Sequence, residues 1–353
     1  LLCFAVTLLI LWNRVYRISY GDSFLPSQYC RVADRVQNMT ETEAEKYFSE
    51  EQQEYDPVRS VIQKEWRSAH NYENYLDKIR SGGSGGLRGL GKNVYQERLQ
   101  KKLQTKCREM DPAEVSFAGG RGVSLFCHTD VADMMAVLMM LLIIFRLVVW
   151  EAESGMDGIN MAARNGAAWL TRIKWAVGLM ASAAVLLLVQ LYKLRLYTSA
   201  YGFTGWNRVI QVLPEFVGVD RRITVYWFVC VFLVCKTAGF LLLYTIFFWL
   251  ACVGRSAVRT VILYGLFTGV SLFTAYGISL SGYLAVLRYF SLAQCINQEM
   301  LLSGYHALKL FQYPVSYLGL WTAVSCVIFF VLAGLIFLFY QNSYTGKVKK
   351  GYR

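Results

Sequence analysis

The residues from Ser81 to Asn93, SGGSGGLRGLGKN, come close to a nucleotide-binding loop. Gly86, four further residues, Gly91 and Lys92 match the first part of the pattern G-x-x-x-x-G-K-[ST], whose backbone cradles phosphates and whose last residue holds Mg²⁺. The position of that Ser or Thr is taken by Asn93, and the preceding NYENYLDKIR is typical of an amphipathic helix rather than a buried strand. We therefore interpret the run as a flexible connector between two helices, and we expect no ATP site in this chain.

Other arrangements of catalytic or metal-binding residues are missing from the sequence. The three histidines lie in separate segments with no partner one helical turn away, at His70, His128 and His306. Neither G-x-S-x-G nor H-E-x-x-H occurs, and the nine cysteines include no Cys-x-x-Cys. We expect no catalytic residue, no metal and no cofactor in this chain. Cys30, Cys107 and Cys127 flank a polar region and could form one disulfide, although free buried thiols are the favoured interpretation.

A lysine lies inside a long apolar segment. Lys236 comes about ten residues after Tyr226, which is roughly 15 Å along a helix. A lysine at the centre of a bilayer costs about 2.5–3.5 kcal/mol, so its side chain should face protein or a water-filled cavity. The candidate partner is Asp133. Two interpretations stay open: a structural pairing or snorkelling, and contact with an anionic substrate or lipid headgroup along a translocation path.

The segment WEAESGMDGINMAARNGAAWLTRIKWAVG follows an apolar stretch directly and opens with Glu151 and Glu153. After Gly155, residues Met156–Arg164 can form a short amphipathic helix with Met156, Ile159 and Ala163 on one side. Acidic residues near a helix start complement its dipole. Taken alone, these residues also fit an ordinary helix that lies on the lipid surface.

The composition of the chain indicates which segments hold these candidate residues in place. The chain has 353 residues, 55% of them hydrophobic, and a mean hydropathy of +0.34. About 20 apolar residues cross a bilayer, and five segments are at or near that length: Val131–Trp150, Ala176–Leu196, Tyr226–Val253, Val258–Leu287 and Leu318–Tyr340. The shorter Leu1–Trp12 is interpreted as the second half of a first transmembrane helix, with a signal peptide as the competing interpretation. The net charge of the chain is +12, and the excess of basic residues flanks these segments. This placement favours a role in membrane topology and lipid contact over nucleic-acid binding.

Residues 13–127 form a polar region rich in good helix formers, and Thr40 with Glu43 predicts a capped helix start. EVSFAGGRGVSLF could hold a short strand or turn before the second span. The expected fold is an all-α polytopic membrane protein of about six transmembrane helices, with a mostly helical extracytoplasmic domain between helices 1 and 2. Residues 128–353 hold helices 2–6, the loop 151–174 and a basic cytoplasmic tail at 341–353.

Several motifs together resemble permeases of the type-2 ABC exporter family, and Gram-positive bacterial members look closest. EAESGMDGINMAARNGAAWLTRIKWA is similar to the E-x-E-x-G … G-R … K segment after their second span, with Asn165-Gly166 in place of Gly-Arg. NYENYLDKI resembles a Y-x-x-Y-x-x-x-I element of their outer domain, and HTDVADMMAVLMMLLIIF resembles the start of their second span. GYHALKLFQYPVSYLGLW is similar to Y-x-x-N-x-F-G-x-P before the last span at Tyr305, Phe311 and Pro314, without the usual Asn or the Gly before Pro.

This resemblance implies cytoplasmic termini, an extracytoplasmic first loop and a coupling helix within Glu151–Lys174. Charge alone does not decide the side, since with that loop outside nine Lys and Arg lie on inner segments and seven on outer loops. The coupling helix would dock into a groove of a separate ABC ATPase subunit, which binds ATP and Mg²⁺. Residues expected at this contact are Glu151, Glu153, Gly155, Met156, Ile159, Met161 and Arg164.

The function implied is a permease subunit that couples ATP hydrolysis by its partner to export of a peptide, lipid or other amphipathic cargo. A second permease, identical or different, would complete the path, with Lys236 and Asp133 as candidate path residues. The alternative is a membrane receptor or signalling scaffold that senses an extracellular peptide through its outer domain. A self-sufficient membrane enzyme is a third class, which the missing catalytic cluster disfavours.

Overall fold

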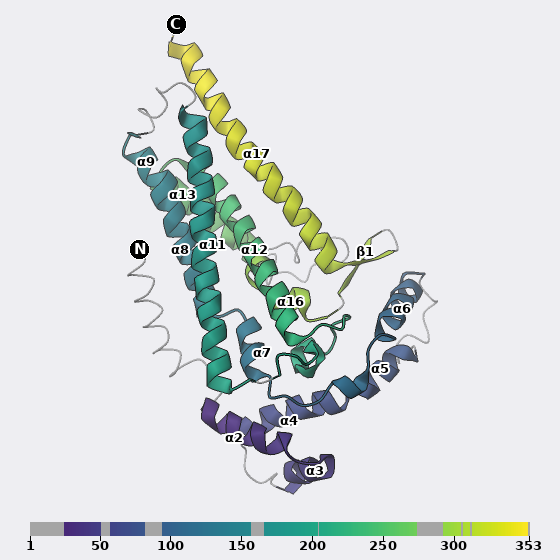
Figure 1. The fold of residues 1–353 in the computed structure, drawn as a ribbon. Coiled ribbons are helices and arrows are strands. Elements are labelled where there is room, and N and C mark those ends of the chain that lie inside the picture. The colour runs from purple at the N-terminus through teal and green to yellow at the C-terminus, as the bar shows by residue number, and fades with distance from the viewer. Residues whose placement is uncertain are drawn as a thin grey trace. The chain divides into compact units, whose positions relative to one another are not determined.

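A computed structural model describes residues 25–50, 57–81, 94–156, 166–203, 205–273, 292–304, 306–310 and 313–351 (Figure 1). Two compact units are formed from discontinuous parts of the chain. Unit 1 takes its described residues from Leu1–His128, Leu191–Phe232 and Glu299–Leu318, and unit 2 takes its own from the intervening segments and Gly319–Arg353. Helices account for 81% of the structure, so the expectation of a helical protein is confirmed.

Unit 1 contains a series of short amphipathic helices: α2 (Pro26–Gln37), α3 (Glu41–Glu50), α4 (Pro57–His70), α5 (Tyr72–Arg80), α6 (Val94–Cys107) and α7 (Arg121–Cys127). Proline begins α2 and α4, where its missing N–H group costs nothing. The predicted helix start at Thr40 is confirmed, because the Glu43 carboxylate accepts a hydrogen bond from the Thr40 N–H group at 2.9 Å. The helices pack around buried aromatic rings such as Tyr29 and Tyr72.

Unit 1 also holds the one departure from an all-α fold within the described residues. Strands β1 (Ala307–Leu310) and β2 (Tyr313–Ser316) form an antiparallel hairpin directly before the last long helix. EVSFAGGRGVSLF, which the sequence allowed as a strand or turn, forms no strand. Its backbone turns at Gly119, whose φ of +60° favours glycine, and α7 follows from Arg121. Short turns complete the unit: η1 (Pro112–Glu114), η3 (Ile210–Val212), η4 (Pro214–Phe216) and α16 (Glu299–Leu302).

Among the described residues, four segments are long and apolar enough to cross a membrane: Arg121–Glu153, Trp169–Tyr201, Val225–Gly254 and Tyr317–Leu338. The first includes α7, α8 (Val131–Ile144), a π-helical turn η2 (Phe145–Val149) and α9 (Trp150–Glu153). The others lie in α11 (Gly166–Tyr201), α12 (Val225–Gly254) and α17 (Tyr317–Gly351). The chain is therefore a multi-pass membrane protein, and four of the predicted spans are confirmed as candidate spans.

The two remaining predicted spans are covered only in part. Leu1–Trp12 lies outside the described residues. For Val258–Leu287 the structure describes α13 (Ala257–Leu272), a shorter apolar helix, and the rest of that segment also lies outside. The count of six spans therefore stays a prediction.

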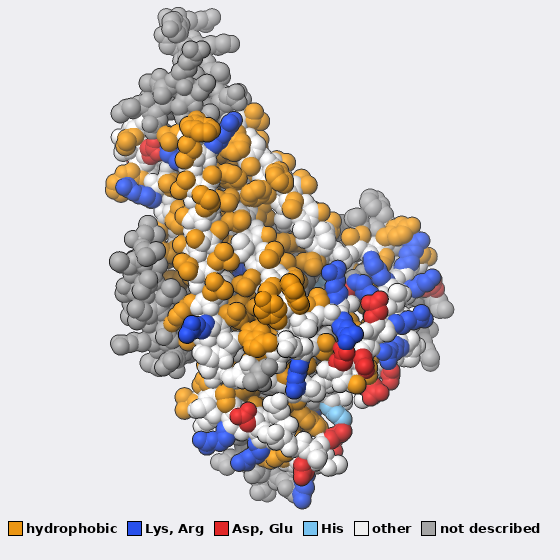
Figure 2. Space-filling model, in the orientation of Figure 1, with side chains coloured by type: hydrophobic (Ala, Val, Ile, Leu, Met, Phe, Trp, Pro, Cys, Tyr) orange, Lys and Arg blue, Asp and Glu red, His pale blue; other side chains and the backbone are white. Residues whose placement is uncertain are grey.

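The core of unit 2 is a cluster of apolar side chains from α8, α11, α12 and α17, centred on Ile144, Tyr244 and Phe248. The Tyr244 hydroxyl donates a hydrogen bond to the Trp175 carbonyl at 3.2 Å. Gly178 allows this approach, because a Cβ there would overlap the Tyr244 hydroxyl. Large apolar side chains also cover much of the outer surface of the spans, where a hydrocarbon environment would solvate them (Figure 2).

Candidate functional site

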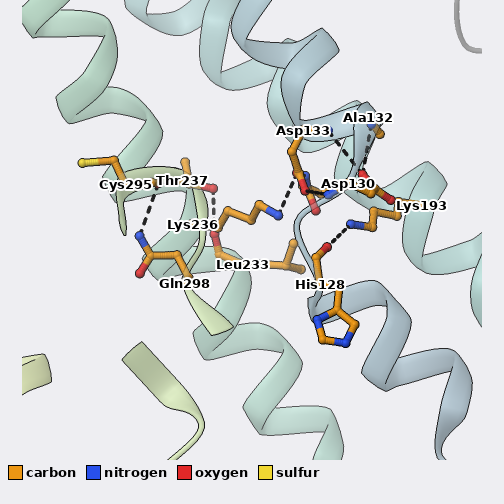
Figure 3. Close-up of polar contacts among 11 residues, drawn as sticks. His128, Asp130, Ala132, Asp133, Lys193, Leu233, Lys236, Thr237, Cys295 and Gln298 are labelled. Atoms are coloured by element: carbon orange, nitrogen blue, oxygen red, sulfur yellow. Dashed lines mark hydrogen bonds and ion pairs between the residues drawn. The ribbon is translucent and has the colours of Figure 1, made fainter. Parts of the chain in front are cut away.

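The lysine within the third described span pairs with the aspartate that the sequence suggested. Lys236 Nζ lies 2.7 Å from Asp133 Oδ1, and only 2% and 1% of the two side chains are exposed. Figure 3 shows the Lys236 side chain extended from α12 toward the start of α8. The predicted pairing is confirmed. Its part in transport stays a prediction, because an ion pair of this kind also serves a purely structural purpose.

A third helix joins the pair. Gln190 on α11, itself buried, donates a hydrogen bond from Nε2 to Asp133 Oδ1 at 2.6 Å. The second Asp133 oxygen accepts the Asp130 N–H group at 3.1 Å, while the Asp130 carboxylate caps the Ala132 N–H group at 3.0 Å. One carboxylate therefore closes the capping box of α8 and links α8, α11 and α12 inside unit 2.

The chemistry available to this cluster is electrostatic. A buried pair with complementary charges is neutral as a whole, which limits its cost in a membrane. Removing either partner would leave one uncompensated charge. An anionic group that reached Lys236 could replace Asp133 as its partner, and a cationic group that reached Asp133 could replace Lys236.

A close contact one turn along α12 was missed by sequence reasoning. A Cβ atom at Gly239 would lie 2.5 Å from the carbonyl oxygen of Cys295, in the short helix α15 (Leu292–Ile296). Gln298, fully buried, donates from Nε2 to the Gln294 carbonyl at 2.8 Å. The only feature of the sequence that could have indicated this contact is a glycine three residues after the lysine, and a glycine alone does not show which segment packs against it.

The two acidic residues at the end of the first described span anchor the chain there. Glu151 forms an ion pair with Lys174 on α11. Glu153 Oε1 accepts a hydrogen bond from the Ala257 N–H group at 2.7 Å, at the first residue of α13. The negative charge therefore lies at the positive end of the α13 dipole. These contacts connect the end of α9 to α11 and α13 within unit 2.

Gly155 and Met156, which follow these anchors, are both exposed. Gly155 has a φ of +74° with open space around it, and the next residue, Met156, is 52% exposed. Ile159, Met161 and Arg164, the other residues expected to contact a partner, lie outside the described residues. The structure therefore gives Glu151 and Glu153 internal partners, whereas the sequence analysis expected them at the contact with an ATPase subunit.

Other residues singled out in the sequence have ordinary surroundings. Within the described ranges no three His, Cys, Asp or Glu side chains gather as a metal site would require. His128 Nδ1 lies 2.5 Å from Glu299 in unit 1. Cys30, Cys107 and Cys127 form no disulfide in the described part of the chain. Apart from Ser81, the glycine run lies outside the described residues, and helices α5 and α6 precede and follow it.

Comparisons with family models, with curated proteins and with solved structures find no match for this chain. The resemblance to exporter permeases therefore stays a prediction from sequence motifs.

Proposed function

We propose that this chain is the membrane-spanning permease subunit of an ATP-driven exporter, with ATP and Mg²⁺ bound by a separate ABC ATPase subunit. The observation that supports this most directly is the anchored end of the first described span. Glu151 and Glu153 hold that end against α11 and α13, and the chain then presents exposed Met156. A segment that is connected to α9, α11 and α13 and exposes an apolar side chain is suited to transmit force from a bound partner to these helices.

The anchors give the mechanism its physical basis. A rigid-body movement of a docked ATPase would pull on residues 156–165, and the contacts of Glu151 and Glu153 would pass that pull to α9, α11 and α13 together. A loop without such contacts would absorb the same movement in its own backbone. Met156, Ile159 and Met161 would fill the groove of the ATPase, with Arg164 at its rim.

The remaining parts of the proposal follow the same logic. Residues 13–127 would lie on the extracytoplasmic side and meet a peptide, lipid or other amphipathic cargo. A second permease would complete the path, and Gly265 and Gly269 on α13, which have open space around them, would permit close approach of another helix. Lys236 would contact an anionic group of the cargo when Asp133 is displaced.

Purification of the full chain from its native membrane in mild detergent tests the proposal. We expect an ATPase subunit to co-purify in stoichiometric amount, to be lost with Met156→Asp, and to be retained with Met156→Leu, which keeps the apolar contact. A preparation that contains no ATPase would overturn the permease assignment. Co-purification of a kinase instead would favour a receptor that signals across the membrane.

A further inference from the structure

Helix α6 of unit 1 carries a row of basic residues along one face. Arg98, Lys101, Lys102 and Lys106 follow the i, i+3, i+4, i+8 spacing that places side chains on the same side of a helix. Glu97 is the sole acidic residue of this helix. Like charges one turn apart weaken a helix by about 0.2–0.5 kcal/mol per pair, and a nearby negative surface would offset this repulsion.

This basic face is attached to the segment that leads into the last span. The Arg98 guanidinium lies 4.1 Å from the ring centre of Tyr313, and Lys102 Nζ donates to the Pro314 carbonyl at 3.2 Å. The last candidate span begins at Tyr317, three residues after Pro314. Even a fully extended chain covers only about 10 Å in three residues, so the Lys102 ammonium lies close to the start of that span.

A second and independent contact ties the same face to another span. Lys106 forms an ion pair with Asp220, which precedes the span beginning at Val225 by five residues. At most about 17 Å of extended chain separates the two. Burial lowers the pKa of Lys106, and the positive charges of Arg221 and Lys102 lower it further. Positive charge is therefore concentrated where two spans begin.

We propose that α6 is a binding surface for anionic phospholipid headgroups, with Arg98, Lys101 and Lys102 directed at their phosphates. The headgroup layer on each side of a bilayer is about 5–8 Å thick, and electrostatic attraction reaches about one Debye length, roughly 8 Å, beyond it. The attachments to Pro314 and Asp220 hold α6 within that range. Lys101 is exposed and makes no ion pair with any residue in the described part of the chain. Tyr313, 59% exposed, is of the residue type that occupies membrane interfaces.

Hydrogen exchange of the full chain in lipid nanodiscs tests this surface. In discs of phosphatidylcholine mixed with phosphatidylglycerol, the amides of α6 should exchange at least about five times more slowly than in discs of phosphatidylcholine alone. The reason is that each basic residue near an anionic surface strengthens binding by about a factor of five. High salt should abolish the difference. Inorganic phosphate added to the phosphatidylcholine discs should not reproduce it, because a free ion lacks the fixed charge of the membrane.

Paired variants separate the surface from a general effect of charge. Lys101→Gln with Lys102→Gln should remove most of the protection. Lys64→Gln with Arg67→Gln, which removes the same charge from exposed positions on α4, should preserve it. Equal exchange in the two lipids, or equal loss of protection in both variants, would overturn the proposal. The experiment requires no ATPase, so its outcome tests the lipid-binding surface independently of the permease assignment.

Discussion

Unit 1 and unit 2 each contain a lysine–aspartate pair, and the two pairs differ in what surrounds them. Lys236 and Asp133 in unit 2 are almost completely buried, with Gln190 as a further ligand of the carboxylate. Lys106 and Asp220 in unit 1 keep 28% and 16% of their side chains exposed. In unit 2 each charge therefore needs the other to offset its loss of water, whereas in unit 1 the pair contributes little to stability. The difference arises because the free energy of an ion pair depends on how much water its partners lose.

The largest effect is expected from breaking the buried pair. Lys236→Met leaves the Asp133 carboxylate without its counter-charge, which should lower stability by about 3–5 kcal/mol. Lys236→Met combined with Asp133→Asn removes both charges and should recover much of that loss. Thermal unfolding of the purified full chain in detergent measures both variants. A double variant as unstable as the single one would show that the two charges are not energetically coupled.

The buried pair was also the part of the candidate site that the sequence predicted best. A charge in an apolar segment has few ways to avoid hydrocarbon, so its need for a partner can be inferred from position alone, and the spans follow from hydropathy in the same way. The partner of Glu153 could not be inferred, since it is a backbone N–H group 104 residues away. Contacts of that kind depend on how helices pack against one another, and the local composition of the sequence does not reveal that packing.

Unit 1 has its own buried polar contact, and its loss should have the next largest effect. The Tyr29 hydroxyl, in a fully buried side chain, donates to the Glu65 carboxylate at 2.6 Å. Tyr29→Phe removes the donor and leaves Glu65 buried, so unit 1 should lose about 1.5–3 kcal/mol. Hydrogen exchange in α2 and α4 should reveal the loss, with little change in α13, which lies wholly in unit 2. Uniform destabilisation of both units would contradict their separation.

The same tyrosine predicts an alkaline limit for unit 1. Burial, followed by the charge of Glu65, raises the pKa of Tyr29 above its ordinary value. A folded-state pKa above the unfolded value of about 10 means that the stabilising contribution is present below pH 10 and is lost as pH rises through the folded-state value. Unfolding monitored through tyrosinate absorbance should therefore begin above about pH 10 in the native chain. Tyr29→Phe should lose this part of the pH dependence.

A matched pair of glycines in unit 2 tests whether packing around the buried cluster is tight. Gly239→Ala places a Cβ against the Cys295 carbonyl, and overpacking of this kind costs about 1–3 kcal/mol. Gly334→Ala, in α17, meets open space and should be neutral or slightly stabilising, since alanine favours a helix. Thermal unfolding of the two variants side by side gives the comparison. Equal effects would mean that α15 yields to the new methyl group.

The smallest effect is expected from the exposed pair of unit 1. Lys106→Gln removes a partly hydrated ion pair, and such pairs contribute about 0–1 kcal/mol. The loss should shrink further because the positive charges of Arg221 and Lys102 already oppose that of Lys106. Thermal unfolding in low and high salt, compared with Lys236→Met under the same conditions, distinguishes the two pairs. A loss as large as that of the buried lysine would show that the electrostatic distinction between the two units is wrong.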